Sequence, residues 1–469
     1  MVFVMRRPAT DVIMMQTPTY TRHELVVILI AVTLASFLIP IFVAMVNIAL
    51  PAIGAAFAVP SETLAILSTT YLVSSVIFLV PAARLADIVG LKKVCVTGLC
   101  ITALATVVAP FSSSIGMLLI CHAVAGIGLA CVISNTIAIL SVAYPPMRRG
   151  AAIGIAVAGV YLGLTAGPLI GGALTQGFGW TSIYFFVCVL CLATAVMIRV
   201  SVKSEIIATP GQPFDLRGSI LYGVTILFLM SGLIRIPEPA AIVSLVIGAV
   251  FLVMFVWFEK KIPYPVFAVR LFTENKVFAR ANLTTMINYG ATFAVSFFMS
   301  LYLQQIGALT PMEAGFVMMA MPVVQMIFSP ITGKLSDKID GRIIMTAGLI
   351  VTGIGMALFG FIGTDYNQIG IIINLAVVGF GIALFGAPNT NLVLGSVERK
   401  DNGSANSILA TTRQMGMVVS MAIATCFILL FYSNNSSVGL VAAMHATFAV
   451  SAVLSFAAAA VGWTAKKSS

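Results

Sequence analysis

Residues 163–172 have the sequence Gly-Leu-Thr-Ala-Gly-Pro-Leu-Ile-Gly-Gly, and they lie within an apolar run that is long enough to cross a lipid bilayer. On an α-helix each residue turns by about 100°, so positions four apart lie on one face. Small residues on such a face let a neighbouring membrane helix pack closely. Pro168 removes one backbone donor, so we expect the helix to bend there. Four glycines form this stripe without side chains: Gly159, Gly163, Gly167 and Gly171.

The composition of the whole chain places it in the membrane. Of its 469 residues, 60% are hydrophobic and only 9% are charged, and the mean hydropathy is +1.10. A soluble domain carries about 25% charged residues, so lipid must be the solvent for this much apolar surface. The 7 cysteines all fall in apolar runs, which argues against a disulfide framework. We therefore predict an all-α integral membrane protein.

The apolar runs predict about fourteen membrane-spanning helices, because one span needs about 20 mostly apolar residues. The two between 218 and 258 are the shortest pair, and without them twelve would remain. The expected boundaries are 25–48, 63–83, 93–112, 116–141, 150–173, 182–200, 218–235, 240–258, 281–305, 314–333, 343–363, 368–394, 404–431 and 438–462.

The positions of Lys and Arg predict the orientation in the membrane. If the N-terminus is placed inside, Arg235 is the one basic residue in an outer connection and Arg413 the one within a span. The others fall in inner connections or tails, as the positive-inside rule requires. This pattern supports an even number of spans, with both termini cytoplasmic and the chain in the cell membrane. It also accounts for the net charge of +10 without a nucleic-acid partner.

Two inner connections resemble each other and indicate an internal repeat. Residues 84–87 are Arg-Leu-Ala-Asp and residues 334–337 are Lys-Leu-Ser-Asp, 250 residues later, and each follows an outward-to-inward span. The repeat predicts two parallel halves related by an axis along the membrane normal. The expected organisation is a cytoplasmic tail at 1–24, a six-helix bundle at 25–200, two linker helices at 201–280, a second six-helix bundle at 281–462 and a tail at 463–469.

Three motifs resemble those of the major facilitator superfamily. Residues 83–93, Ala-Arg-Leu-Ala-Asp-Ile-Val-Gly-Leu-Lys-Lys, are similar to its first inner-loop signature, with Ala83 in place of the first Gly. The spacing that begins at Gly154 and ends at Gly171-Gly172 resembles the antiporter motif of its exporters in the fifth helix. Residues 46–51, Val-Asn-Ile-Ala-Leu-Pro, look like those of the fourteen-helix drug:proton antiporters of the EmrB/QacA type. The resemblance implies the major facilitator fold and alternating access.

The inner-loop signature implies a conformational latch. In the family, the Asp of this loop pairs with helix ends and basic groups and holds one conformation. The resemblance assigns that role to Asp87, with Asp337 as its counterpart in the second half; the alternative is a solvated loop carboxylate. The latch residues carried over from the motif are Arg84, Asp87, Gly90, Lys92 and Asp337.

Two positions depart from the antiporter branch. An Asp usually stands five residues before the Asn of the first span, and here Phe42 takes its place. His122 stands where the fourth span usually has Arg. Both positions are associated with proton coupling in the family. Because histidine ordinarily titrates near pH 6.5, His122 is our candidate for proton coupling; the alternative is a neutral histidine hydrogen-bonded between helices.

Polar residues within the spans predict a substrate cavity, because ionisable and polar groups in a bilayer are costly. In this superfamily the first and fourth helices of each half line the path. None of the 15 acids falls well inside an expected span, which favours neutral, weakly basic or anionic amphiphiles over dications. Arg413 either extends to the inner surface or faces the cavity and attracts an anion. For any single one of these residues, hydrogen bonding between helices is the alternative. The candidates are Asn47, Asn135, Tyr161, Asn288, Tyr289, Asn389, Asn391 and Arg413.

The sequence contains no nucleotide-binding loop and no catalytic or metal-binding set of residues, so we expect neither an enzyme nor a cofactor. The motifs favour a monomeric exporter of amphiphilic small molecules, of the multidrug efflux type, in exchange for protons. A uniporter, a lipid flippase or an importer on the same fold remains an alternative. So does a membrane sensor or scaffold without transport.

Overall fold

The computed structural model of the protein describes residues 20–236, 238–336, 338–398, 401–432 and 436–464, and every regular element in them is a helix. The first half of the chain forms α1 (Arg22–Phe57), α2 (Ser61–Val89), α3 (Leu91–Val108), η1 (Ala109–Phe111), α4 (Ile115–Ala143), α5 (Pro146–Phe178) and α6 (Ser182–Ser201). Two helices follow, α7 (Leu216–Ile234) and α8 (Pro239–Glu259). The second half forms α9 (Arg270–Glu274), α10 (Lys276–Thr292), α11 (Ala294–Gln305), α12 (Pro311–Met318), α13 (Ala320–Ser336), α14 (Gly341–Leu358), η2 (Phe359–Phe361), α15 (Gln368–Gly395), α16 (Asn402–Phe431) and α17 (Ser437–Trp463).

The described residues contain 14 helices that are long and apolar enough to cross a membrane, which confirms the fourteen predicted spans. The first helix extends to Phe57 instead of ending near residue 48, because Pro51 lies inside α1 rather than after it.

The ninth and tenth spans are each built from two helices. Between α10 and α11, the backbone N–H of Ala294 donates to Ser420 Oγ at 3.0 Å. A side chain of α16 thus enters the helical ladder there and breaks it. The break between α12 and α13 comes shortly before Pro322, a residue that has no N–H to continue the ladder.

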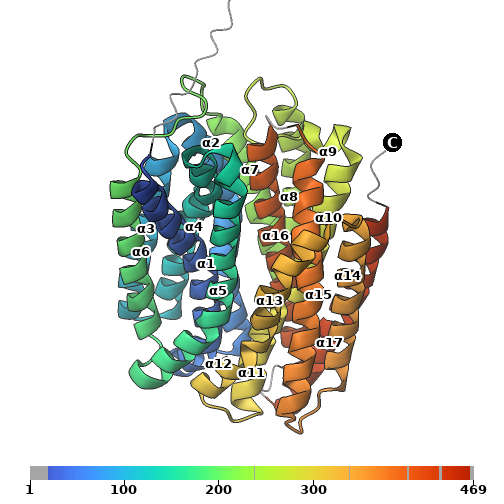
Figure 1. The fold of residues 1–469 in the computed structure, drawn as a ribbon. Coiled ribbons are helices and arrows are strands. Elements are labelled where there is room, and N and C mark those ends of the chain that lie inside the picture. Colours follow the sequence, from blue (N-terminus) through green and yellow to red (C-terminus); the bar gives the residue numbers. More distant parts are fainter. Residues whose placement is uncertain (1–19, 237, 337, 399–400, 433–435, 465–469) are drawn as a thin grey trace, which may run out of the picture.

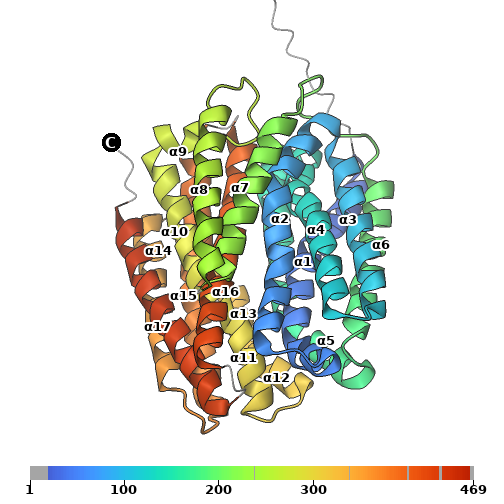
Figure 2. The ribbon, with the colours of Figure 1, turned by 180° about the vertical axis from the view of Figure 1, so that it is seen from behind.

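The two halves lie side by side and pack directly on each other through α2 and α16, and α7, with α8 against it, covers one side of their boundary (Figures 1 and 2). α7 is held against α2 by Tyr222, whose hydroxyl donates to the carbonyl of Val76 at 3.0 Å. α1 begins and α17 ends at the same end of the molecule, which also carries the α2–α3 junction with Lys92 and Lys93 (Figure 1). We call this the basic end, and the other the opposite end.

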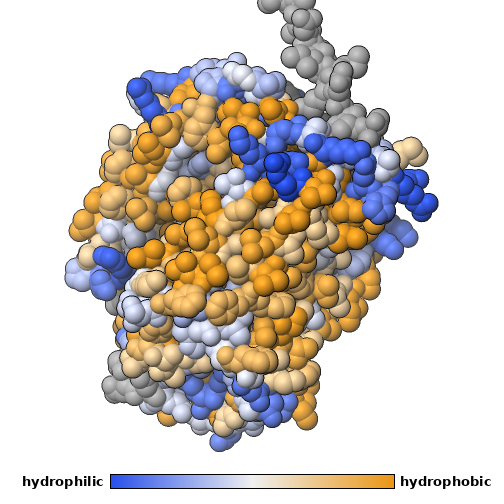
Figure 3. All heavy atoms as spheres, turned by 90° about the vertical axis from the view of Figure 1, so that its left-hand side faces the viewer, coloured by the Kyte–Doolittle hydropathy of each residue, from blue (hydrophilic) through white to orange (hydrophobic). Residues whose placement is uncertain are grey.

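On the face shown in Figure 3, the surface between the two ends is mainly apolar. On α3 and α6, for example, Leu104 and Val196 are both 62% exposed. A contiguous apolar belt of this size is unfavourable in water and is matched by lipid. The chain is therefore a multi-pass membrane protein.

The glycine stripe packs α5 against α1. A methyl group on Gly163 would lie 2.9 Å from Pro40, and one on Gly171 would lie 2.8 Å from Met45 Cα. Neither distance leaves room for a side chain. Gly154, by contrast, has no neighbouring atom within 4 Å of such a methyl group, so it does not take part in this interface.

Candidate functional site

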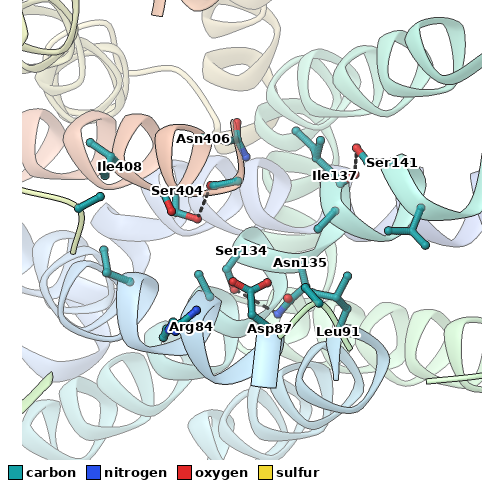
Figure 4. A pocket seen from close by; sticks show the side chains of 18 of the residues that line it. Arg84, Asp87, Leu91, Ser134, Asn135, Ile137, Ser141, Ser404, Asn406 and Ile408 are labelled. Atoms are coloured by element: carbon teal, nitrogen blue, oxygen red, sulfur yellow. Dashed lines mark hydrogen bonds between the residues drawn. The ribbon is translucent and has the colours of Figure 1, made fainter. Parts of the chain in front are cut away.

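A cavity of about 710 Å³ lies at the basic end, between the two halves. We call it the vestibule. Its wall comes from α2, α4 and α5 on one side and from α16 and residues 265–268 on the other (Figure 4). The lining combines apolar residues with polar ones, among which are Arg84, Asp87, Ser134, Asn135, Arg149 and Ser404.

Helical periodicity brings these polar groups to the vestibule. Arg84 and Asp87 are three residues apart near the end of α2, so they share one face. On α16, Ser404 and Ser407 have the same spacing and line the wall across from them. Asn135 of α4 also faces the cavity; its amide nitrogen donates to the carbonyl of Cys131 at 2.6 Å, and its oxygen has no partner in the described chain.

The inner-loop motif is bound to the segment that follows α6. The carbonyl of Asp87 accepts from Ala208 and Thr209 at 3.0 and 2.9 Å. The side chain of Arg84 donates to Gln212 at 2.6 Å, and the ammonium of Lys92 donates to the carbonyl of Val202. Backbone and side-chain bonds therefore fix the loop, while the Asp87 carboxyl remains on the vestibule wall.

Gly90 ends α2 with a φ of +124°, a conformation that favours glycine. Asp337, the expected counterpart of Asp87, lies outside the described residues. Among the residues predicted to form the latch, the structure therefore describes only those of the first half of the chain.

At the opposite end the two halves touch, and we call this contact the seal. Pro51 has no N–H, so the carbonyl of Asn47 one turn earlier lacks its helical partner. Ser300 of α11 supplies one, with its hydroxyl donating to that carbonyl at 2.6 Å. Gln304 donates in the same way to the carbonyl of Ile48 at 3.0 Å. Thus Asn47 lies in the seal rather than on the vestibule wall.

Glycines complete the seal between α5 and α12. A methyl group on Gly172 would lie 2.8 Å from the carbonyl carbon of Pro311. One on Gly315 would lie 2.8 Å from that of Pro168. The end of the antiporter motif therefore contacts the second half, whereas its stripe contacts α1.

His122 lies in a buried aromatic cluster formed with Phe42, Tyr71, Trp180 and Tyr184. Its ring centroid is 5.9 Å from that of Phe42, and the residue is 1% exposed. Its Nδ1 lies 2.9 Å from the carbonyl of Leu118, and its Nε2 lies 3.4 Å from the Tyr184 hydroxyl. This pattern suits a neutral imidazole with its proton on Nδ1. The two positions that depart from the antiporter branch are therefore in contact.

The remaining candidates in the second half lie in three places. Asn288 is fully buried, and neither of its amide atoms has a partner in the described chain. Asn389 donates to Thr285 Oγ1 at 2.6 Å. Asn391 is exposed and donates to Ser336 Oγ at 3.1 Å.

Arg413, Tyr289 and Tyr161 come together deeper in the bundle. The guanidinium of Arg413 donates to Thr390 Oγ1 at 2.7 Å and lies 6.0 Å from the centre of the Tyr289 ring. Tyr161 of α5 is within electrostatic reach of both. Arg413 therefore points among helices rather than to the surface at the basic end.

Sequence reasoning missed several vestibule residues. Ser404, Asn406 and Ser407 form a polar run at the start of an apolar span, and this run was a usable signal. Arg149 was assigned only to the positive-inside pattern, yet it lines the cavity.

A pair of acids at the basic end of α7 and α8 was also missed. Glu259 is 3% exposed, and one of its oxygens accepts from the N–H of Phe267 at 3.2 Å. Its other oxygen and Asp215 Oδ2 both lie against Gly218, so the two carboxyl groups are close enough to share a proton. Among the described residues, no group of three or more His, Cys, Asp or Glu is placed to hold a metal ion.

Comparisons of the sequence with a family model and with known transporters agree with each other. The family model described as Major Facilitator Superfamily matches residues 32–269 and 281–468. The multidrug resistance protein Stp of Mycobacterium tuberculosis is 28% identical over 401 residues, which cover 84% of this chain and 74% of Stp. The riboflavin transporter RibZ of Clostridioides difficile is 26% identical over 413 residues, which cover 87% of this chain and 88% of RibZ.

Among solved structures, a POT family transporter in complex with 5-aminolevulinic acid matches with a TM-score of 0.73. The match covers 95% of this chain and 97% of that chain at 14% sequence identity. This likeness supports the fold alone.

Proposed function

The chain belongs to the Major Facilitator Superfamily, and we propose that it exports amphiphilic small molecules by alternating access. The observation that carries this proposal is the combination of an open vestibule at the basic end with a seal at the opposite end. Such a structure is one of the two end states that alternating access requires. The relative named as a multidrug resistance protein supports the substrate class.

The positive charges indicate which end faces the cytoplasm. Arg84, Lys92, Lys93 and Arg149 all lie at the basic end, and Lys and Arg concentrate on the cytoplasmic side of membrane proteins. We therefore assign the basic end, with the start of α1 and the end of α17, to the cytoplasm of a cell-membrane protein. The vestibule then receives substrate from inside the cell, as an exporter requires.

The moving parts in this proposal are the two halves, residues 25–200 and 281–462, with α7 and α8 on one side of their boundary. The vestibule has walls from both halves, and the seal joins α1 and α5 to α11 and α12. A rocking motion that breaks the seal and closes the vestibule would present the substrate outside. The motif at 84–92 would hold the inward-open state through its bonds to residues 202–212.

Proton exchange is the part of the proposal that depends on His122. The aromatic cluster satisfies this residue in its neutral form, so coupling through it requires that the cluster open in the other conformation. A uniporter is the second candidate, because Phe42 and His122 replace both groups of the usual coupling pair and contact each other.

The test is a transport assay in inverted membrane vesicles with a panel of amphiphilic dyes and a fluorescent probe of internal pH. Vesicles without the protein are the control. Dye uptake with proton release in the wild type, and loss of the proton signal in His122→Phe, would support exchange through His122. Equal proton release in both proteins would remove His122 from the mechanism. Dye movement without proton movement would support the uniporter, and no dye movement at all would refute the exporter.

A further inference from the structure

We propose that Arg413 anchors a subsite for the carboxylate of an amphiphilic anion, with Tyr161 and Ser329 as further donors to that carboxylate. The inference rests on the proposed function and names the class of substrate. The site combines one residue of the first half with residues of α13 and α16 in the second, so a ligand there would bridge the parts that must move.

Arg413 lies on the face of α16 that leads from the vestibule into the bundle. It is eleven residues into α16, about 16 Å from the start of that helix at the basic end. Asn406 lines the vestibule and is seven residues earlier, which is two helical turns on the same face. A headgroup at Arg413 would thus lie about 10 Å along the helix from Asn406, and its apolar tail would extend toward the vestibule.

The charge of Arg413 has no counter-ion among the described residues. A guanidinium offers five N–H donors, and within the described chain Arg413 makes one hydrogen bond, to Thr390. The three ion pairs among the described residues are Lys203–Glu24, Arg270–Asp401 and Arg342–Asp340, so none includes Arg413. An unpaired cation inside a membrane protein is costly and marks a functional site. A carboxylate matches the planar fork of the guanidinium with two parallel hydrogen bonds.

Ser329 and Tyr161 together give a second indication of a ligand. Ser329 is 6% exposed, and its hydroxyl interacts with the hydroxyl of Tyr161, which is also close enough to Arg413 to interact with its charge. Two hydroxyls bonded to each other use one O–H and leave the second O–H to donate elsewhere, and the described chain offers Ser329 no other partner. Buried donors are normally paired, so a free O–H next to a cation indicates a missing acceptor.

The groups that meet here are all able to donate. The guanidinium and the two hydroxyls can each give a hydrogen bond to an anion, and no described carboxylate competes for them. A cationic amphiphile would bring a like charge to Arg413 and would find no acidic partner there. The site therefore selects for anions over cations of the same size.

The experiment measures binding of a matched pair of fluorescent probes to the purified full-length protein in detergent. The probes are 11-(dansylamino)undecanoate and the corresponding primary amide, which differ in the charge of the headgroup alone. The variants are Arg413→Gln, which removes the charge, and Tyr161→Phe, which removes one hydroxyl and keeps the ring. Arg217→Gln is the matched control, because Arg217 is an exposed arginine at the start of α7. Size-exclusion profiles establish that each variant is folded.

Wild type should bind the carboxylate more tightly than the amide. Arg413→Gln should weaken carboxylate binding by on the order of 10- to 100-fold, the range for a hydrogen bond to a charged group, and leave amide binding within twofold. Tyr161→Phe should weaken carboxylate binding less than Arg413→Gln does. If Arg413→Gln fails to fold, a selective loss of carboxylate binding in Tyr161→Phe would support the proposal. Equal losses for both probes, or wild type that does not prefer the carboxylate, would overturn the subsite. Dye export that persists in that case would leave the exporter proposal standing.

Discussion

A methyl group added to Gly172 should shift the protein away from the conformation described above. Gly172 packs on the backbone of α12, where the new methyl would overlap the carbonyl oxygen of Pro311 and lie 2.9 Å from Met312 Cα. Non-bonded carbon atoms are comfortable at about 3.5–4.0 Å, and a backbone cannot turn aside as a side chain does. Gly172→Ala therefore forces α5 and α12 apart at the seal.

The magnitude depends on which state bears the strain. Extra methyl groups in packed interiors cost about 1–3 kcal/mol, and at Gly172 that cost falls on the sealed state alone. The ratio of opened to sealed molecules should then rise by about 5- to 150-fold. Gly171 is the matched comparison, because its methyl would meet Met45 and Ile48 of α1, within the same half. Gly171→Ala strains both states, so it should lower thermal stability and leave their ratio unchanged.

The assay measures the distance between two spin labels, one on each half of the protein, at the opposite end of the molecule. Labels at Gln176 and Gln368, both exposed, report on α5 and α15 in a background without the native cysteines. Gly172→Ala should add a longer distance component that Gly171→Ala lacks. Gly154→Ala, where nothing lies within 4 Å, should have no effect on the distances and slightly favour the helix. Identical distributions in wild type and Gly172→Ala, or the same change in Gly171→Ala, would refute this account of the seal.

Four further substitutions test other parts of the structure. Ser300→Ala leaves the carbonyl of Asn47 without a hydrogen-bond donor, which should destabilise the seal by about 1–3 kcal/mol. The same pair of spin labels would detect the opening, and an unchanged distance distribution would show that this hydrogen bond does not stabilise the seal. Phe42→Asp and His122→Arg should each lower the melting temperature, because each buries a charge without a partner. The double variant should recover part of this loss, because the two side chains are in contact and the new charges are opposite. Additive losses in the melting temperature would contradict this. Glu259→Gln replaces a carboxylate that repels Asp215 with an amide that can donate to it, so at a pH where both acids are ionised it should stabilise the protein by about 1 kcal/mol, with a lower melting temperature as the opposing result.

The spans were predictable from the sequence because lipid imposes a simple length and composition on them. Each apolar run corresponds to one span, including the short pair that forms α7 and α8. The stripe at Gly159–Gly171 was predictable as a packing surface for a similar reason, since helical geometry fixes which residues share a face. Its partner helix was not predictable, because that depends on the arrangement of the whole bundle.

The site was harder to predict because its contacts are long-range. Nothing local to Phe42 or His122 shows that their rings meet. The break before Ala294 depends on Ser420, 126 residues later in the chain. α1 runs past the predicted end of the first span and through Pro51, because a hydroxyl from the other half pairs with the carbonyl that this proline frees.

In each contact of the seal described above, one of the two partners is a main-chain atom. Ser300 and Gln304 bond to carbonyls of α1, and Gly172 and Gly315 rest on the backbone of Pro311 and Pro168. Main-chain atoms do not change when a residue is replaced. Mutations that accumulate over evolution in the vestibule can therefore alter which compounds are carried without disturbing closure at the far end. A transporter built in this way can acquire new substrates while it keeps its barrier to leakage.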